Sequence, residues 1–166
     1  IAVELLEKLL NDEVKSKFRT NVVKQRKFSV LLKNALTKYQ NRSIEAAQVI
    51  AELIEMAKDF KNDLDKSKAL NLSTAENAFY DALANNKSAE DLMGEEVLVQ
   101  IAREIAEKLR QNVTVDWSVR ESVRARLRLL VKNLLRKYKY PPDEQDEATE
   151  LVLSQAAVIS AELAQE

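Results

Sequence analysis

Apolar residues recur along the chain at steps of three and four positions, which is the spacing of one face of an α-helix. The clearest case begins near Ser43, where the expected core face is Ala46, Ile50, Leu53, Ala57, Phe60 and Leu64. These steps place the side chains on one stripe, as a contact between two helices requires. The polar residues 61–71 that follow are expected to form a frayed end or a linker.

Two helices are expected before this one. The first covers about residues 2–11, and its apolar stripe is Leu5, Leu6, Leu9 and Leu10. The second follows a basic stretch, and its apolar stripe is Phe28, Leu31, Leu32, Ala35, Leu36 and Tyr39. Both stripes have the period of a helix with one buried face.

Two more helices are expected after residue 71. Ser73 or Thr74 caps a short helix at residues 75–84, because a hydroxyl oxygen can accept a hydrogen bond from the first helical turn. Ser88 is expected to open a longer helix that ends near Arg110 and has Gly94 in its first turns, at a cost of roughly 1 kcal/mol relative to alanine. Its core face is Val97, Leu98, Ile101, Ile105 and Leu109.

The last two helices meet at a pair of prolines. Asp116 or Ser118 is expected to cap the first of them, and its stripe is Val119, Val123, Leu127, Leu130, Leu134 and Tyr138. Tyr140 precedes Pro141 and is therefore disfavoured in helical geometry, so Pro141 and Pro142 should form a stiff corner. The stripe of the final helix is Ala148, Val152, Ala156, Ile159 and Leu163.

The composition agrees with an all-α fold. The 166 residues include a single glycine and two prolines, whereas sheets and their tight turns use many glycines. We therefore expect one helical bundle of about seven helices and no sheet over residues 1–166, with a possible internal boundary near residues 65–73. Because the sequence opens with Ile1 and not Met, it is expected to be a fragment of a longer protein.

Several classes of chemistry lack the residues they need. The chain has no histidine and no cysteine, which removes the usual neutral-pH acid–base group and the usual zinc ligands. One glycine cannot build a phosphate-binding loop or a dinucleotide fingerprint. Adjacent acids such as Glu95 and Glu96 lie at expected helix starts, where they offset the helix dipole. We predict no catalytic site, no metal site and no cofactor for this chain, and a cytoplasmic location without a membrane span.

Charge is segregated along the chain although the net charge is only −1. Nine basic residues and no acid lie between Val14 and Arg42, and the candidate contacts in this block are Lys24, Arg26 and Lys27. A second block holds eight basic residues between Ser118 and Lys139. Five of these follow one another at steps of four: Arg120, Arg124, Arg128, Lys132 and Arg136. They form a basic ridge that drifts slowly around the helix.

The residues leave three interpretations of the basic ridge open. It can be a solvated face that pairs with nearby acids, namely Glu121 and the acids after Pro142, since such pairs are common and individually weak. It can bind a polyanion, because each lysine or arginine replaces a counterion. It can also be a protein interface, where arginine is enriched. In the first block, Phe18 and Phe28 are expected to be core residues and not stacking platforms for bases.

A longer stretch around the ridge carries a family resemblance. The sequence VDWSVRESVRARLRLLVKNLLRKYKYPPDEQDEATELVLSQA resembles the carboxy-terminal helical region of the motor (R) subunit of type I restriction endonucleases. The stretches AFYDALANN and MGEEVLVQIAREIAEKLRQN lie upstream in the same order, so that the resemblance covers about residues 78–162. Such subunits carry a nuclease domain and two motor domains that use ATP and Mg²⁺, and none of their motifs occurs here.

The resemblance implies a non-catalytic assembly module. It would dock the motor subunit onto the methyltransferase and specificity subunits through the basic ridge, with the Lys24, Arg26 and Lys27 cluster second. The alternative is a module that contacts duplex DNA and guides it to the motor. Matched positions with an expected structural role are Asp116, Trp117, Tyr140, Pro141 and Pro142. Lys139 stands where the family pattern has glycine, so the corner was expected to differ there.

Overall fold

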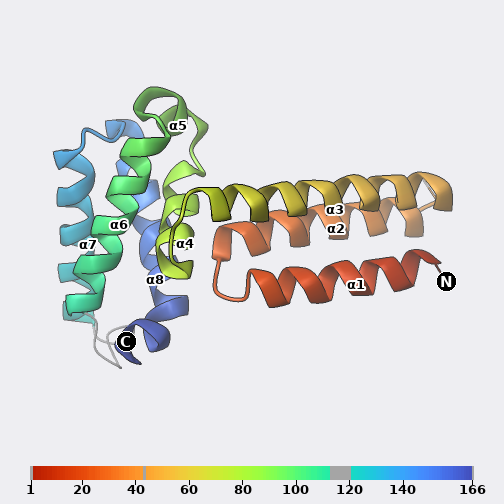
Figure 1. The fold of residues 1–166 in the computed structure, drawn as a ribbon, viewed down its shortest axis with the longest axis horizontal. Coiled ribbons are helices and arrows are strands. Elements are labelled where there is room, and N and C mark those ends of the chain that lie inside the picture. Colours follow the sequence, from red (N-terminus) through yellow and green to blue (C-terminus); the bar gives the residue numbers. More distant parts are fainter. Residues whose placement is uncertain (1, 43, 113–120, 166) are drawn as a thin grey trace. The chain divides into compact units, whose positions relative to one another are not determined.

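The chain is helical throughout the part that the structure describes. The computed structural model describes residues 2–42, 44–112 and 121–165, and these contain eight α-helices, one short 3-10 helix and no strand (Figure 1). The prediction of an all-α fold is confirmed. The chain divides into two compact units: unit 1 holds Ile1–Arg19 and Val23–Asn71, and unit 2 holds Thr20–Val22 and Leu72–Glu166.

Unit 1 is built from three helices: α1 (Ala2–Lys17), α2 (Val22–Gln40, which belongs to this unit from Val23) and α3 (Ala46–Ala69). Three phenylalanines form the centre of its core. Phe18 and Phe28 stack with ring centroids 5.8 Å apart, and Phe60 meets both rings edge-on at 5.1 and 5.3 Å. Such offset and edge-on pairs are favoured arrangements of aromatic rings. Phe18 and Phe28 are thus core residues, as predicted.

The helices of unit 1 are longer than predicted, and this shifts their buried faces. Residues 61–69 continue α3, so the expected linker there is wrong. On α1, Leu5 and Leu9 are 59% and 55% exposed, and the buried residues are Val3 and Val14. Leu6 and Leu10 of the predicted stripe are partly buried against the same core as Val3 and Val14, so half of that stripe is confirmed. On α3 the buried stripe is Val49, Leu53, Met56 and Phe60. It shares Leu53 and Phe60 with the predicted stripe, and the predicted Ile50 and Leu64 pack partly buried against the same core, so that stripe is partly confirmed.

One carboxylate ties α2 to α3. Asp63 Oδ2 accepts hydrogen bonds from Lys24 Nζ at 3.0 Å and from Lys27 Nζ at 2.8 Å. Burial of Asp63 by itself raises the pKa of this carboxyl, but the hydrogen bonds and charges of Lys27 and Lys24 outweigh it and leave the pKa below its ordinary value. The charged form of Asp63 therefore stabilises the folded state.

In unit 2, the short helix α4 (Thr74–Ala84) packs against two longer helices. Its other helices are α5 (Lys87–Met93), α6 (Glu95–Asn112), α7 (Glu121–Lys137), the 3-10 helix η1 (Pro142–Glu144) and α8 (Gln145–Gln165). Helix α4 packs against α6 and α8, and α7 packs against α6 and α8 (Figure 1). The residues 78–83 of α4 are all buried. The predicted core positions Leu98, Ile101, Ile105 and Leu109 of α6 are also buried, which confirms that face.

Helix α4 begins as the sequence predicts. Ser73 Oγ accepts a hydrogen bond from the Glu76 N–H at 3.1 Å, and Glu76 Oε1 accepts one from the Ser73 N–H at 2.9 Å. This reciprocal pair is a capping box, which satisfies two backbone donors that the first turn cannot pair internally. The cap therefore determines where α4, the first helix of unit 2 after α3, begins.

A short turn between α1 and α2 belongs to unit 2 through its polar contacts. Gln155, fully buried on α8, accepts a hydrogen bond from the Val22 N–H at 2.7 Å and donates one to the Thr20 carbonyl. Asn21 Nδ2 donates to Asp81 Oδ2 on α4 at 2.7 Å. Leaving such buried groups unpaired would cost free energy, so this network fixes one position for the turn.

The predicted fifth helix is in fact two helices, so the described residues hold eight α-helices where about seven were expected. Gly94 has φ 84° and ψ 159°, a conformation that is essentially restricted to glycine, and it separates α5 from α6. The cap is also different from the prediction. Asn86 Oδ1 accepts a hydrogen bond from the Ser88 N–H at 2.9 Å, so Asn86 caps α5 in place of Ser88.

The proline corner ends α7 and leads into α8. Lys139 has φ 59°, its N–H donates to the Arg136 carbonyl, and the Tyr140 N–H donates to the Leu135 carbonyl at 2.8 Å. This is the Schellman arrangement, in which glycine is usual at the left-handed position. Lys139 takes that position, so the expectation that the corner differs because lysine stands there is wrong. Tyr140 is fully buried, and its hydroxyl donates to the Leu83 carbonyl at 2.8 Å.

Burial, with a smaller effect of Glu144 and Glu147, raises the pKa of Tyr140 to about 12. The phenol therefore stays a neutral donor at the corner. Pro141 and Pro142 then begin η1, as the sequence predicts. None of the helices in the described part of the chain combines the length and the apolar content that crossing a bilayer requires.

Replacing Gly94 by alanine tests the break between α5 and α6. No atom lies within 4 Å of the position that a Cβ would take, so the effect would come from the backbone conformation alone. We expect Gly94→Ala to lower the free energy of unfolding by roughly 1–3 kcal/mol. Urea unfolding followed by circular dichroism measures it, with Glu96→Ala as a control of small effect. A continuous helix would instead be stabilised by about 1 kcal/mol, so a gain in stability would contradict the break.

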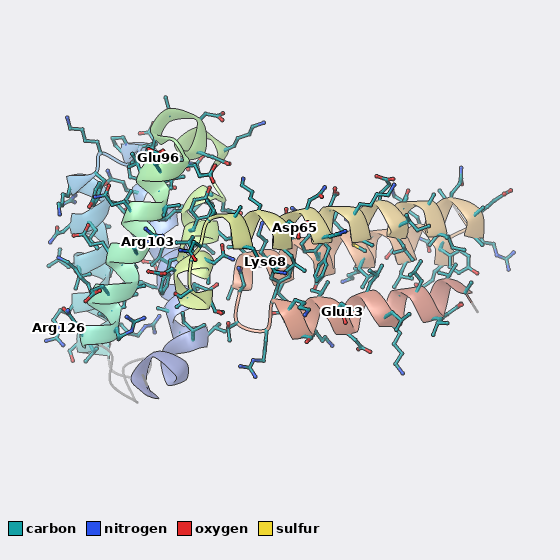
Figure 2. The ribbon with its side chains drawn as sticks, viewed as in Figure 1. Glu13, Asp65, Lys68, Glu96, Arg103 and Arg126 are labelled. Atoms are coloured by element: carbon teal, nitrogen blue, oxygen red, sulfur yellow. The ribbon has the colours of Figure 1, made fainter. Side chains whose placement is uncertain are left out.

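The pH dependence of stability tests the Asp63 ion pairs. Because the folded-state pKa of Asp63 is lowered, its contribution is present above the ordinary aspartate pKa of about 4 and is lost as pH falls through the folded-state pKa. Asp63→Asn should therefore cost about 1–2 kcal/mol at pH 7 and progressively less below pH ~4. Asp65→Asn, at an exposed acid on the same helix, is the control (Figure 2). If Asp63→Asn lowered the free energy of unfolding equally at pH 7 and below pH ~4, the charge of Asp63 would be ruled out as the cause.

Candidate partner-binding site

The predicted basic ridge lies on α7, but its members do different things. Arg120 lies outside the described residues, as do the matched positions Asp116 and Trp117. Arg124 and Arg136 are exposed and form no ion pair with another described residue. The two central members of the ridge, by contrast, are engaged by α8.

Arg128 and Lys132 pair with acids that follow the proline corner. Arg128 Nε donates to Glu150 Oε1 at 2.6 Å, and its Nη2 lies 3.4 Å from Oε2. Lys132 Nζ lies 2.8 Å from Asp146 Oδ1. The hydrogen bond that Arg128 donates to Glu150, together with the charge of Glu150, raises the pKa of Arg128. Lys132 lowers the pKa of Asp146, with a smaller effect of Arg136. For these two residues, the interpretation that the ridge pairs with nearby acids is confirmed.

Lys137 is held on the other side of α7. Its Nζ lies 3.2 Å from Glu104 Oε1 on α6, and the Tyr138 hydroxyl donates to Glu104 Oε2. The hydrogen bond from Tyr138, aided by Lys137, lowers the pKa of Glu104. A third cation of the block is thereby neutralised, on the α6 side.

The remaining surface of α7 faces away from both neighbours. Its buried residues are Leu127, Val131, Leu134 and Leu135. At 100° per residue, the opposite side of the helix carries Arg126, Leu129, Asn133 and Arg136, which we call the outward face. All four are exposed, and Leu129 at its centre is 58% exposed. Figure 2 labels Arg126 on α7.

The sequence carried a signal for the outward face. Steps of four residues advance 40° beyond one full turn, so a ridge at that spacing rotates around the helix and cannot stay on one face. Its middle members reach the α8 side, and Arg136 reaches the outward face. Arg126, which is not a member of the ridge, joins it there.

The second basic cluster, on α2 in unit 1, is largely neutralised as well. Lys24 and Lys27 both bind Asp63, and Lys27 Nζ also lies 5.0 Å from the centroid of the Phe28 ring. Arg26 is exposed and forms no ion pair with another described residue. Of the three predicted contacts, Arg26 is the one that the described structure leaves for a partner.

The described side chains do not gather into a metal-binding set. No group of three or more histidine, cysteine, aspartate or glutamate residues lies close enough together to hold an ion within the ranges that the structure covers. Tyr140, Pro141 and Pro142 lie at the corner between α7 and α8, where they set the position of both helices.

Comparison with known proteins gives the family. The family described as type I restriction enzyme HindI endonuclease subunit-like, C-terminal, matches residues 1–162. The chain is 47% identical over 161 residues to the type I restriction enzyme HindI endonuclease subunit of Haemophilus influenzae, which covers 97% of the chain and 15% of that protein. It is 30% identical over 135 residues to the putative type I restriction enzyme MjaIXP endonuclease subunit of Methanocaldococcus jannaschii, covering 81% of the chain and 13% of that protein.

No solved structure matches the chain. The chain spans about 15% of the length of the HindI subunit and 13% of the MjaIXP subunit. The family match includes the residues before Asn71, where the sequence alone showed no family motif. The chain therefore belongs to the family of C-terminal regions of HindI-like type I restriction endonuclease subunits.

Proposed function

We propose that this region is a non-catalytic docking module that binds the endonuclease subunit to the methyltransferase and specificity subunits of its restriction system. The observation that supports it is the outward face of α7, where the exposed Leu129 lies between Arg126 and Arg136. Arg128 and Lys132 are already neutralised by α8, so the outward face is where this helix can gain most from a partner.

The chemistry of the outward face fits a protein partner. Arginine is enriched in protein interfaces because it combines a planar charged group with apolar stem atoms. Burying a leucine that is otherwise in water contributes up to about 1.5–3 kcal/mol. A partner surface with an apolar pocket and one or two flanking carboxylates would satisfy all three side chains. Asn133 supplies a further hydrogen-bonding group on the same face.

Duplex DNA is the alternative partner, and it has weaker support. Phosphate binding gains from each cation that is free to replace a counterion. In both basic blocks, cations that the sequence offered for this role are bound to carboxylates of the same chain: Lys24, Lys27, Arg128 and Lys132. An exposed leucine at the centre of the outward face adds nothing to phosphate binding.

Catalysis is proposed to occur elsewhere in the assembly. The resemblance to the motor subunit implies use of ATP and Mg²⁺, and both need glycine-rich loops or carboxylate clusters. The whole chain has one glycine, and the described residues hold no cluster of three potential metal ligands. The proposal therefore assigns the nucleotide and the metal to other domains and gives this region a binding role.

Charge reversal on α7 tests the proposal. The double variant Arg126→Glu and Arg136→Glu, and separately Leu129→Gln, should each reduce recovery of the affinity-tagged chain with the methyltransferase and specificity subunits about tenfold or more, as expected for interface anchors. A double variant with the same charge change elsewhere, Lys61→Glu and Lys87→Glu, is the control.

A charge swap between α7 and α8 tests whether the partner binds the outward face or the basic ridge. Arg128→Glu combined with Glu150→Arg keeps an ion pair between α7 and α8 and leaves the outward face intact, so it should be recovered normally. Circular dichroism checks that each variant is folded. Undiminished recovery of the Arg126 and Arg136 variant would contradict the proposal. If that variant also lost a mobility shift on duplex DNA, the outward face would be assigned to DNA.

A further inference from the structure

A groove with an apolar floor lies between α2 and α3 in unit 1. It has a volume of about 390 Å³, and Leu31 and Ala35 from α2 and Ala51 and Met56 from α3 form its apolar surface. Leu31 is 42% exposed and leaves apolar surface open in the groove. The groove stays open because α3 packs more closely on α1 than on α2.

Carboxylates line the α3 side of this groove. Glu52, Glu55 and Asp59 are spaced by three and four residues, which places them on one side of the helix, and no lysine or arginine lines the groove. Glu52 lies 3.6 Å from Lys38, and Glu55 lies 3.2 Å from Lys58 on its own helix. Both pairs are exposed and therefore weak. Asp59 forms no ion pair with another described residue.

Ion pairs between the two helices mark both ends of the groove. Lys38 meets Glu52 at one end, and Lys24 and Lys27 meet Asp63 at the other. Glu52 and Asp63 are eleven residues apart on α3, which corresponds to about 16 Å along the helix axis. This length fits about three turns of a bound helix.

We propose that this groove binds a basic amphipathic helix of a partner protein. The apolar face of that helix would lie over Leu31, Ala35 and Met56, and its lysine or arginine residues would pair with Glu55 and Asp59. Laying an amphipathic helix into an apolar groove is a common mode of recognition. The charge complementarity selects the occupant, because a row of three carboxylates repels nucleic acid and acidic peptides.

A second copy of the chain is a less suitable occupant. Its outward face on α7 carries Leu129 between two arginines, but this face and the groove are different surfaces. Pairing them between copies would be heterologous, and such contacts propagate into rings or open chains and do not close as a dimer. The groove is in unit 1 and α7 is in unit 2, so this inference is independent of the proposed docking function.

A labelled model peptide tests the inference on the full chain. The probe is a fluorescein-labelled helix of leucine and lysine, with leucines at steps of three and four, and its binding is followed by fluorescence anisotropy. We expect saturable binding and a tenfold or greater rise in Kd for the double variant Glu55→Lys and Asp59→Lys. The control Glu13→Lys and Asp65→Lys makes the same charge change outside the groove (Figure 2) and should change Kd less than twofold.

A matched pair of variants tests the apolar part of the groove separately. Leu31→Gln should raise Kd about fivefold or more, whereas Leu9→Gln, at an exposed leucine of α1, should leave it unchanged. Arg126→Glu with Arg136→Glu should also leave peptide binding unchanged, which separates this test from the docking test.

Three results would overturn the inference. One is the absence of saturable binding by the unaltered chain. Another is an equal loss of binding in the groove and control charge reversals, which would mean general attraction between opposite charges. The third is self-association of the chain that Asp59→Lys and Arg126→Glu each abolish in sedimentation, which would assign the groove to a second copy.

Discussion

Ion pairs between neighbouring helices determine which parts of this surface remain available to a partner. Arg128 and Lys132 of α7 bind Glu150 and Asp146 of α8, and Lys24 and Lys27 of α2 share Asp63 of α3. The pair of Arg128 with Glu150 is exposed and adds little to stability, whereas Asp63 is partly buried between its two lysines. For recognition, these pairs neutralise four cations that the sequence offered as contacts: Lys24, Lys27, Arg128 and Lys132. On the outward face of α7, an exposed leucine lies between two arginines that form no such pair with another described residue.

The same constraint gives the two units surfaces of opposite character. On α7 in unit 2, the outward face combines an exposed leucine with positive charge. In unit 1, the groove between α2 and α3 combines an apolar floor with negative charge. A chain with one glycine, no histidine and no cysteine has few means for bond chemistry, but helices of mixed composition can present several such surfaces. Such surfaces fit the docking role that we propose for this region.

Sequence periodicity predicted the helices well where large apolar side chains mark one face. The buried stripe of α6 and the capping box at Ser73 follow directly from such local patterns. Periodicity failed only in part on α3, where Leu53 and Phe60 are buried as predicted but Val49 and Met56, outside the predicted stripe, are buried as well. It also failed at Gly94, because a glycine that is merely tolerated in a helix and one that requires a positive φ look alike in sequence. The buried contacts of Gln155 with Thr20 and Val22 join residues far apart in the chain, which no local pattern shows.

For the candidate site, the sequence located the basic helix but not its exposed side. Pairing of Arg128 and Lys132 with the acids beyond Pro142 depends on the angle that the corner imposes between α7 and α8. Cross-linking in the assembled enzyme tests the assignment of the outward face most directly. A photoreactive benzoylphenylalanine in place of Leu129 is predicted to cross-link to the methyltransferase or specificity subunit, whereas the same group in place of Leu92, 76% exposed on α5, is not. Equal cross-linking from both positions, or none from position 129, would contradict the account.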